Sequence, residues 1–186
     1  MHHHNPEFHF CPVCGGPVHS TCIKWGEPER LVCSACDFVL YLDPKVVSCT
    51  VLETEGNIVL LKRAIKPQSG KWVLPGGYVD RGEPVPQAAV REAQEECGLE
   101  IRIKRLLGVY SYPGKIPVVI VYMAEAVGGE MISGDETREA KMFSEATIPW
   151  QNLAFQSTAD ALRDYFSHIR THKNNKGEKA RHENDT

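Results

Sequence analysis

The chain contains 186 residues, of which 42% are hydrophobic and 24% are charged, and its formal net charge is −3. This composition is typical of a globular protein, and the length suffices for one medium domain and one small domain. Because the net charge is slightly negative, the composition excludes a global basic field of the kind that attracts nucleic acid or an anionic membrane. No apolar run approaches the roughly 18 residues that a membrane-spanning helix requires.

The first ten residues, MHHHNPEFHF, lack the apolar core of a signal peptide. Their three consecutive histidines fit either a tag or native sequence and are left out of the fold prediction. Seven cysteines, an odd number that includes two Cys-x-x-Cys pairs, favour a metal site in a reducing compartment over a disulfide framework. We therefore expect a cytoplasmic protein.

The two cysteine pairs, CPVC at residues 11–14 and CSAC at residues 33–36, are separated by 18 residues. Two thiolate pairs at this spacing predict a tetrahedral zinc site, with a redox couple as the alternative. The expected ligands are Cys11, Cys14, Cys33 and Cys36. Four protein ligands leave no position for water, so the zinc is predicted to be structural. His19 and Cys22, which lie between the pairs, are not expected to bind it. Residues 8–45 then form a small zinc ribbon whose folding depends on the metal.

Residues 45–53 and 57–64 predict two strands joined by the turn TEGN. A loop over residues 65–83 leads to a helix from Pro84 to Cys97, with Gly98 just past its end. Residues 101–112 and 116–127 predict further strands. Strands mixed with a few helices are typical of an α+β sandwich.

A closing helix is predicted over residues 159–169, because its apolar residues recur at helical spacing on one side: Leu162, Tyr165, Phe166 and Ile169. Residues 171–186 contain Ala180 as their one apolar residue. This segment cannot bury enough surface to offset the entropy of ordering, so it is predicted to be a disordered tail. The main domain accordingly spans residues 46–170.

The predicted helix at 84–97 carries three acids within five positions, Glu92, Glu95 and Glu96. At 100° per residue they project within about 100° of one another, beside an apolar stripe that consists of Ala89, Val90, Ala93 and Cys97. Like charges at this spacing destabilise a helix, and its dipole disfavours negative charge near the C-terminal end. A bound divalent cation with a preference for oxygen ligands, magnesium or manganese, would reverse both effects. The alternative is a solvated acidic face.

This segment is similar to the Nudix box, G-x5-E-x7-R-E-U-x-E-E-x-G-U, in which U is a bulky aliphatic residue. The chain has Gly77, Glu83 and then the run Arg91-Glu92-Ala93-Gln94-Glu95-Glu96-Cys97-Gly98-Leu99 at the required spacing. Ala93 is smaller than the usual aliphatic residue, and every fixed position matches. The preceding KWVLPGG also resembles the segment that leads into the box. The resemblance implies the Nudix fold, an α/β/α sandwich with a mixed sheet.

The resemblance also implies an enzyme, a pyrophosphohydrolase that cleaves a nucleoside diphosphate linked to another moiety. By position, the magnesium ligands are expected to be Glu92 and Glu96, then Glu95 and the main-chain carbonyl of Gly76. Glu83 and Arg91 would orient the loop and the ligand carboxylates. The later segment GDETREAKMF resembles the part of the family that brings a further acid to the site, for which Glu139 is favoured over Glu136. The alternative for both is an exposed loop acid.

A zinc ribbon in front of a Nudix domain resembles the NADH pyrophosphatases and a group of small enzymes that act on ADP-ribose and FAD. The NADH group carries S-Q-P-W-P-F-P-x-S after the box, whereas this chain has SYPGKIP without the Trp and Phe. The expected substrate is therefore ADP-ribose or FAD, with release of AMP, ahead of NADH. A homodimer is expected by analogy with relatives.

Several further residues are candidates for substrate contacts. Lys62 and Arg63 could clamp phosphate. Four aromatic residues could stack on a base or ring, or belong to the core: Trp72, Tyr110, Tyr112 and Phe155. A non-catalytic nucleotide-sugar sensor is the competing function, which the intact box disfavours. A nucleic-acid role for the ribbon is disfavoured because it offers too few cations, namely Lys24, Arg30 and Lys45.

Overall fold

The structure, a computed structural model, describes the backbone of residues 8–182 and the side chains of residues 8–171. The chain divides into two compact units between Pro44 and Lys45, one residue from the boundary predicted from the sequence. Among the described residues, no helix is long and apolar enough to cross a membrane.

The first unit is a three-stranded antiparallel sheet in the order β1-β2-β3. Its strands are β1 (Val18–Thr21), β2 (Arg30–Cys33) and β3 (Val39–Leu40). β1 and β2 form a hairpin in which Val18 faces Cys33 and Thr21 faces Arg30. This pairing places the two Cys-x-x-Cys turns at the same end of the hairpin.

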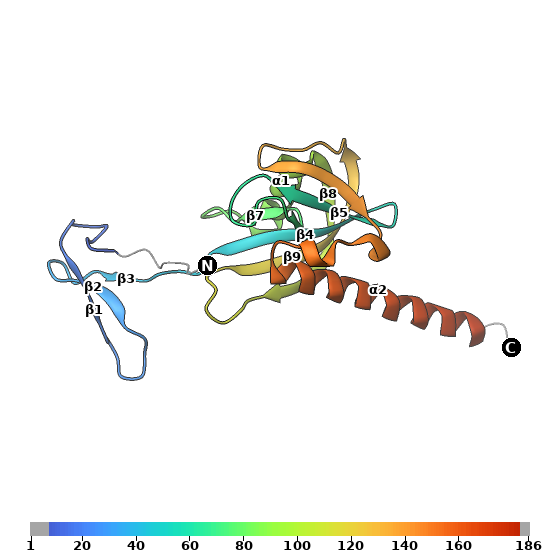
Figure 1. The fold of residues 1–186 in the computed structure, drawn as a ribbon. Helices are drawn as coiled ribbons and strands as arrows, with labels where there is room; N and C mark the ends of the chain where they lie inside the picture. The colour runs from blue at the N-terminus through green and yellow to red at the C-terminus, as the bar shows by residue number, and fades with distance from the viewer. Residues whose placement is uncertain (1–7, 183–186) are drawn as a thin grey trace. The chain divides into compact units, whose positions relative to one another are not determined.

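The second unit is built on a mixed sheet with the strand order β10-β5-β4-β9-β8, to which β6 is added on β5 and β7 on β4 (Figure 1). β4 and β9 are parallel, and every other pair is antiparallel. The strands are β4 (Val46–Thr54), β5 (Asn57–Arg63), β6 (Trp72–Val73), β7 (Gly76–Tyr78), β8 (Leu99–Tyr110), β9 (Val118–Gly129) and β10 (Thr137–Phe143). The sequence predicted β4, β5, β8 and β9 but not the shorter β6 and β7 or the edge strand β10.

The hairpin of β4 and β5 turns at the predicted TEGN. Thr54 pairs with Asn57, and the two residues between them, Glu55 and Gly56, have φ angles of 50° and 78°. Two positive φ angles in a two-residue loop are typical of the type I′ turn, whose twist matches that of the strands.

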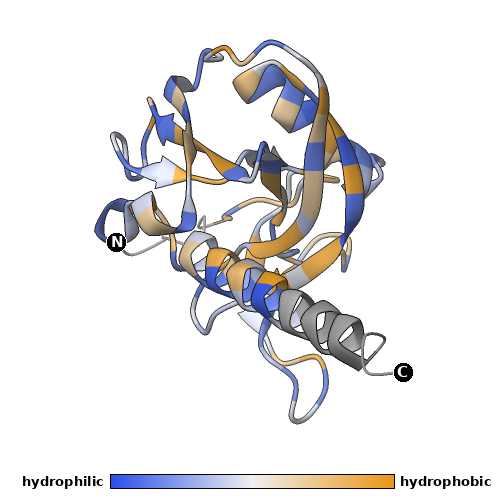
Figure 2. Cartoon of the chain, turned by 90° about the vertical axis from the view of Figure 1, so that its right-hand side faces the viewer, coloured by the Kyte–Doolittle hydropathy of each residue, from blue (hydrophilic) through white to orange (hydrophobic). Residues whose placement is uncertain are grey.

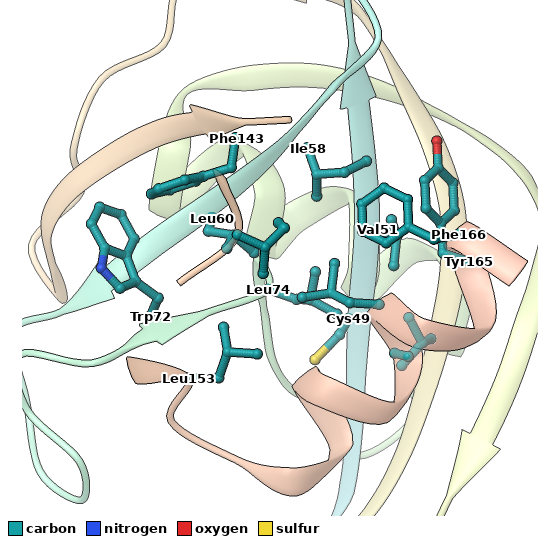
Figure 3. Close-up of a cluster of buried hydrophobic side chains, with 14 of the residues drawn as sticks. Cys49, Val51, Ile58, Leu60, Trp72, Leu74, Phe143, Leu153, Tyr165 and Phe166 are labelled. Carbon is teal, nitrogen blue, oxygen red and sulfur yellow. The ribbon is translucent and has the colours of Figure 1, made fainter. Parts of the chain in front are cut away.

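Helix α1 (Val85–Cys97) covers one face of the sheet and helix α2 (Gln156–His182) the other. Alternate side chains of each strand supply the two cores. Val51 packs in the cluster with Leu162 and Tyr165, of which Figure 3 labels Val51 and Tyr165, whereas Leu52 packs in the cluster with Ala93 and Cys97. Figure 2 shows hydrophobic segments, in orange, along the strands of the sheet. The expected α/β/α sandwich is therefore confirmed. Two short 3₁₀ helices, η1 (Glu145–Thr147) and η2 (Trp150–Asn152), connect β10 to α2.

α1 begins after Pro84 and ends at Gly98, whose φ of 71° is the left-handed conformation usual for a helix end. Its buried residues are Ala88, Ala89, Ala93 and Cys97, all of them small. The prediction that Val90 belongs to the buried stripe was wrong, because this residue is 39% exposed. The contact face is centred on the alanines, which allow the helix to approach the sheet closely.

α2 begins at Gln156 and continues to His182, so it differs from the prediction of a helix that ends near residue 169. Leu162, Tyr165 and Phe166 are buried as predicted, and Ile169 packs against the same cluster. Residues 171–182, predicted to be disordered, extend the helix. They contain several good helix formers and no proline, and extension of an existing helix avoids the cost of nucleation. Residues 183–186 lie outside the described residues.

Candidate active site

Two glycines in β7 allow close packing, Gly76 against β4 and Gly77 against a side chain of α1. Gly76 pairs with Cys49, and its φ of 149° together with a close contact to the Ser48 carbonyl leaves no room for a side chain. A Cβ atom on Gly77 would overlap the carboxylate of Glu92. The Gly-Gly dipeptide therefore brings the backbone of β7 directly against the glutamates of the helix.

Glu96 is held against β7 by a main-chain hydrogen bond. The N–H of Gly76 donates a hydrogen bond of 2.8 Å to Glu96 Oε2. Burial raises the pKa of Glu96 to about 7, and the negative charges of Glu92 and Glu136 add to this effect. Among the described residues, no lysine or arginine forms an ion pair with Glu96. The site thus contains a largely buried carboxylate without a paired cation.

Glu92 and Glu95 differ from each other in exposure. The side chain of Glu92 is 14% exposed, and burial is the main cause of its raised pKa. The side chain of Glu95 is 58% exposed. The structure therefore brings Glu92 and Glu96 together beside the glycines and leaves Glu95 at the rim.

Arg91 connects the box loop to the helix. Its Nε and Nη2 atoms bond the two carboxylate oxygens of Glu83 at 2.9 and 3.0 Å, while Nη1 bonds Glu92 at 2.7 Å and Glu95 at 3.1 Å. Nη2 also donates to the carbonyl of Tyr78 at 3.1 Å. The hydrogen bonds from Arg91 hold the pKa of Glu83 below its usual range. Such a network fixes the orientation of both the loop and the carboxylates. The role of the Tyr78 carbonyl was missed, because a main-chain acceptor leaves no signal in the sequence.

The acid that precedes β10, Glu136, lies close enough for its charge to raise the pKa values of both Glu92 and Glu96. Its segment packs on the end of α1, where the N–H of Gly134 bonds the Glu96 carbonyl at 3.1 Å. Glu139, in contrast, lies 3.5 Å from Lys62 Nζ and is not among the main causes of either pKa shift. The structure thus brings Glu136 to the glutamates, although the sequence favoured Glu139.

Three of the four aromatic candidates have other partners. Trp72 is 8% exposed and packs edge to face on Phe143 in the core, which is the second of the two alternatives left open for it (Figure 3). The hydroxyls of Tyr110 and Tyr112 each donate a 2.8 Å hydrogen bond to α2, to Asp164 and Asp160 respectively. The ring of Phe155 lies beneath the guanidinium of Arg63, with 5.2 Å between the Arg63 Cζ atom and the ring centroid.

The four predicted zinc ligands converge. The sulfur atoms of Cys11, Cys14, Cys33 and Cys36 all lie within 4.8 Å of one another. Two of these separations, 3.8 Å for Cys11–Cys36 and 3.5 Å for Cys14–Cys33, match the edge of a tetrahedron with Zn–S bonds of about 2.3 Å. Main-chain N–H groups of Val13, Gly16 and Ala35 donate to the sulfur atoms of Cys11, Cys14 and Cys33 at 3.4 Å each, which favours the thiolate form.

His19 and Cys22 lie outside the zinc group, as predicted. His19 Nδ1 lies 3.1 Å from the Ser34 hydroxyl, and Cys22 Sγ bonds the Lys24 carbonyl at 2.9 Å. Among the described residues, the four cysteines are the single group of three or more ligand side chains that converge this closely. The glutamates of α1 are instead bonded to Arg91 and Gly76.

The fold is a mixed sheet between two helices. Its site places glutamate carboxylates of α1 against the two glycines of β7, an arrangement suited to a metal-dependent hydrolase. Residues 42–165 match the NUDIX domain and residues 9–42 match the Nudix N-terminal zinc ribbon. The chain therefore belongs to the Nudix family of hydrolases, and the box resemblance is confirmed.

Individual relatives agree with this assignment. The chain is 41% identical to an ADP-ribose pyrophosphatase of Methanocaldococcus jannaschii over 130 residues, which cover 68% of this chain and 75% of the relative. It is 32% identical to an NAD-capped RNA hydrolase of Pseudomonas putida, of which it spans 50%. A crystal structure of a NUDIX hydrolase from Nitrosomonas europaea has a TM-score of 0.83 and 34% identity, and the match covers 88% of this chain and 93% of that one.

Proposed function

We propose that the chain hydrolyses the diphosphate bond of ADP-ribose or FAD in a magnesium-dependent or manganese-dependent reaction that releases AMP. The observation that carries the proposal is the pair of largely buried carboxylates, Glu92 and Glu96, against Gly76 and Gly77 of β7, where no described lysine or arginine forms an ion pair with Glu96. The identity of 41% to an ADP-ribose pyrophosphatase supports the choice of substrate.

The donor set fits a hard divalent cation. Glu92 and Glu96 offer carboxylate oxygens, the Gly76 carbonyl offers a third ligand, and Glu95 at the rim offers a fourth. Burial and mutual repulsion raise the pKa values of Glu92 and Glu96, and a bound cation would remove this penalty. When bound, such an ion neutralises the diphosphate and lowers the pKa of a coordinated water.

The other residues of the site orient these ligands and handle the proton. Arg91 and Glu83 fix the carboxylate of Glu92, the end of β7 at Tyr78 and the loop that follows it. Glu136 is the acid best placed to act as a further ligand or as the general base that takes the proton of the attacking water. Glu139 is the alternative for this role.

The test is a turnover panel with ADP-ribose, FAD, NADH and a nucleoside triphosphate, with products identified by chromatography. We expect metal-dependent AMP release from ADP-ribose or FAD, and Glu96→Gln should abolish it. Glu100→Gln, which alters an exposed acid of β8, is the matched control and should retain activity. Full activity of the Glu96 variant would refute the metal assignment.

NADH or an NAD cap is the second candidate, because several relatives are NAD-capped RNA hydrolases of which the chain spans about half. Formation of reduced nicotinamide mononucleotide and AMP from NADH would identify it. An NAD-capped oligonucleotide extends the panel to RNA, with nicotinamide mononucleotide and a 5′-monophosphorylated RNA as the expected products. Binding without product from any substrate would instead support the sensor. The homodimer and the cytoplasmic location stay predictions.

A further inference from the structure

Arg63 is the last residue of β5, and its main chain is fixed at the edge of the active site. Its N–H bonds the Lys71 carbonyl at 2.9 Å, and its own carbonyl accepts the N–H of Gly70 at 2.8 Å. The next residue, Ala64, donates to the carbonyl of Glu136 at 2.8 Å. Arg63 is therefore anchored beside the segment that brings Glu136 to α1. Its positive charge also opposes the rise in the pKa of Glu96.

The guanidinium of Arg63 is held without an acidic partner. Its Nε atom donates a 2.9 Å hydrogen bond to the Pro67 carbonyl, and its plane lies over the ring of Phe155. Among the described residues, Arg63 forms no ion pair with Asp or Glu, whereas the adjacent Lys62 pairs with Glu139. These two contacts leave the terminal nitrogens of Arg63 available, and their planar N–H groups match two oxygens of one phosphate.

Phe155 is as firmly fixed as the arginine that it supports. The preceding residue, Ala154, donates a 2.7 Å hydrogen bond to the Trp72 carbonyl. The Phe155 carbonyl accepts the N–H of Ala159 in the first turn of α2 at 3.3 Å. The ring packs against the core cluster beneath α1. The core cluster thus contacts one part of the Phe155 ring, and the Arg63 guanidinium lies over another part. The ring can therefore support the cation.

We propose that Arg63 binds the diphosphate of the substrate next to Glu96 and that Phe155 is the positioning residue that holds Arg63 for this contact. This inference rests on the proposed hydrolase function and assigns to Phe155 a role other than base stacking or plain core packing, the two alternatives that the sequence left open. A preorganised arginine loses less conformational entropy on binding than a mobile one. The contact stabilises bound substrate and transition state alike, so it lowers KM and leaves kcat nearly unchanged.

The test compares Arg63→Gln, Phe155→Leu, Phe155→Tyr and the double variant Arg63→Gln/Phe155→Leu. Loss of a hydrogen bond to a charged group predicts that Arg63→Gln raises KM for ADP-ribose by about 10- to 100-fold. Loss of the ring beneath the cation predicts a rise of about 2- to 5-fold for Phe155→Leu. Phe155→Tyr keeps an aromatic face and should retain the KM of the wild type. In the Arg63→Gln background, Phe155→Leu should have no further effect.

Two further measurements separate positioning from a general structural role. The Kd of α,β-methylene ADP-ribose, a non-hydrolysable analogue, is measured without divalent metal and should rise in parallel with KM. Trp150→Leu is the matched control, because Trp150 carries Arg163 at 5.6 Å in a second, exposed stack outside the site. This variant should leave KM unchanged, and melting temperatures show which variants are folded.

An unchanged KM and Kd in Arg63→Gln would overturn the proposal, as would equal effects of Phe155→Leu in the presence and absence of Arg63. If Phe155→Leu fails to fold, Arg63→Gln and Phe155→Tyr still decide it, because the first must raise KM and the second must not. A wild-type protein that binds the analogue through Arg63 but releases no AMP would refute the hydrolase function and leave the binding role of Arg63 supported.

Discussion

At the scale of single residues, the site depends on a position without a side chain. The Glu92 carboxylate would overlap a Cβ atom on Gly77, and Arg91 donates a 2.7 Å hydrogen bond to this carboxylate. The geometry of one proposed metal ligand is therefore set jointly by a glycine in a strand and by an arginine with four further contacts. Each of them can be tested without removal of the ligand itself.

We predict that Gly77→Ala impairs catalysis more than stability. The new methyl group overlaps the end of a flexible glutamate, so Glu92 moves aside and the fold is kept. A displaced ligand should lower metal affinity and kcat by about 10- to 100-fold, as is usual when the support of a metal ligand is lost. Metal titrations and steady-state kinetics measure both quantities.

Gly128→Ala is the control for this prediction. A Cβ atom on Gly128 would lie 2.7 Å from Glu100 Oε2, so it displaces a carboxylate that is exposed on β8. This variant should keep wild-type activity. Equal activity of the two alanine variants would show that the position of Glu92 is unimportant.

Arg91→Lys should also lower activity, although the charge is conserved. A lysine cannot reproduce the two parallel bonds to Glu83 together with those to Glu92 and the Tyr78 carbonyl. We expect kcat to fall by about 10- to 100-fold, with a larger metal concentration needed for half-maximal activity. Restoration of full activity by saturating metal would limit the role of Arg91 to metal affinity.

At the scale of elements, α1 is positioned by the segments that follow it. Its C-terminal Gly98 lies against the carbonyl of Glu130 and the side chain of Ile132. The N–H groups of Ile132 and Gly134 bond the carbonyls of Cys97 and Glu96 at 3.1 Å each. The end of α1 and the loop before β10 are therefore bonded to each other, and together they carry Glu96 and Glu136.

Gly98→Ala should destabilise the contact between the end of α1 and the loop before β10. An alanine in the left-handed conformation costs about 1–2 kcal/mol, and the overlap with the Glu130 carbonyl adds to that cost. Gly114→Ala is the matched control, since Gly114 has a similar φ of 70° and nothing within 4 Å of its Cβ position. Denaturant unfolding should show a larger loss for Gly98→Ala, and equal losses would mean that the contact with Glu130 contributes nothing.

The box helix was predictable from the sequence because its signals are local: the spacing of Glu83, Arg91 and Glu92 lies within one loop and one helix. The further acid was not. β10 was missed, and its register against β5 shifts between Thr137 and Glu139. Since a change of one residue moves a side chain to the other face of a strand, the choice between Glu136 and Glu139 required the structure. The hydrogen bonds of Tyr110 and Tyr112 were equally inaccessible, because their partners lie about fifty residues away in α2.

At the scale of the whole molecule, the two units are stabilised by different means. The second unit has a buried cluster on each face of its sheet. In the first unit, several large hydrophobic residues are exposed, and the buried ones include the predicted zinc ligands Cys11 and Cys33. We therefore expect a unit of this size without a substantial core to depend on bound zinc for its folding free energy.

Removal of zinc should therefore unfold the first unit selectively. With a strong chelator, we expect loss of one zinc per chain and loss of amide hydrogen-exchange protection in β1 and β2, since the four thiolates repel one another without the cation. Protection of β4, β5 and α1 should persist, because the core on each face of that sheet contains no zinc ligand. Cys36→Ser should reproduce the effect, whereas Cys22→Ser should retain zinc, since Cys22 lies outside the ligand group. Protection of β1 and β2 that survives complete zinc removal would contradict a structural role for the metal.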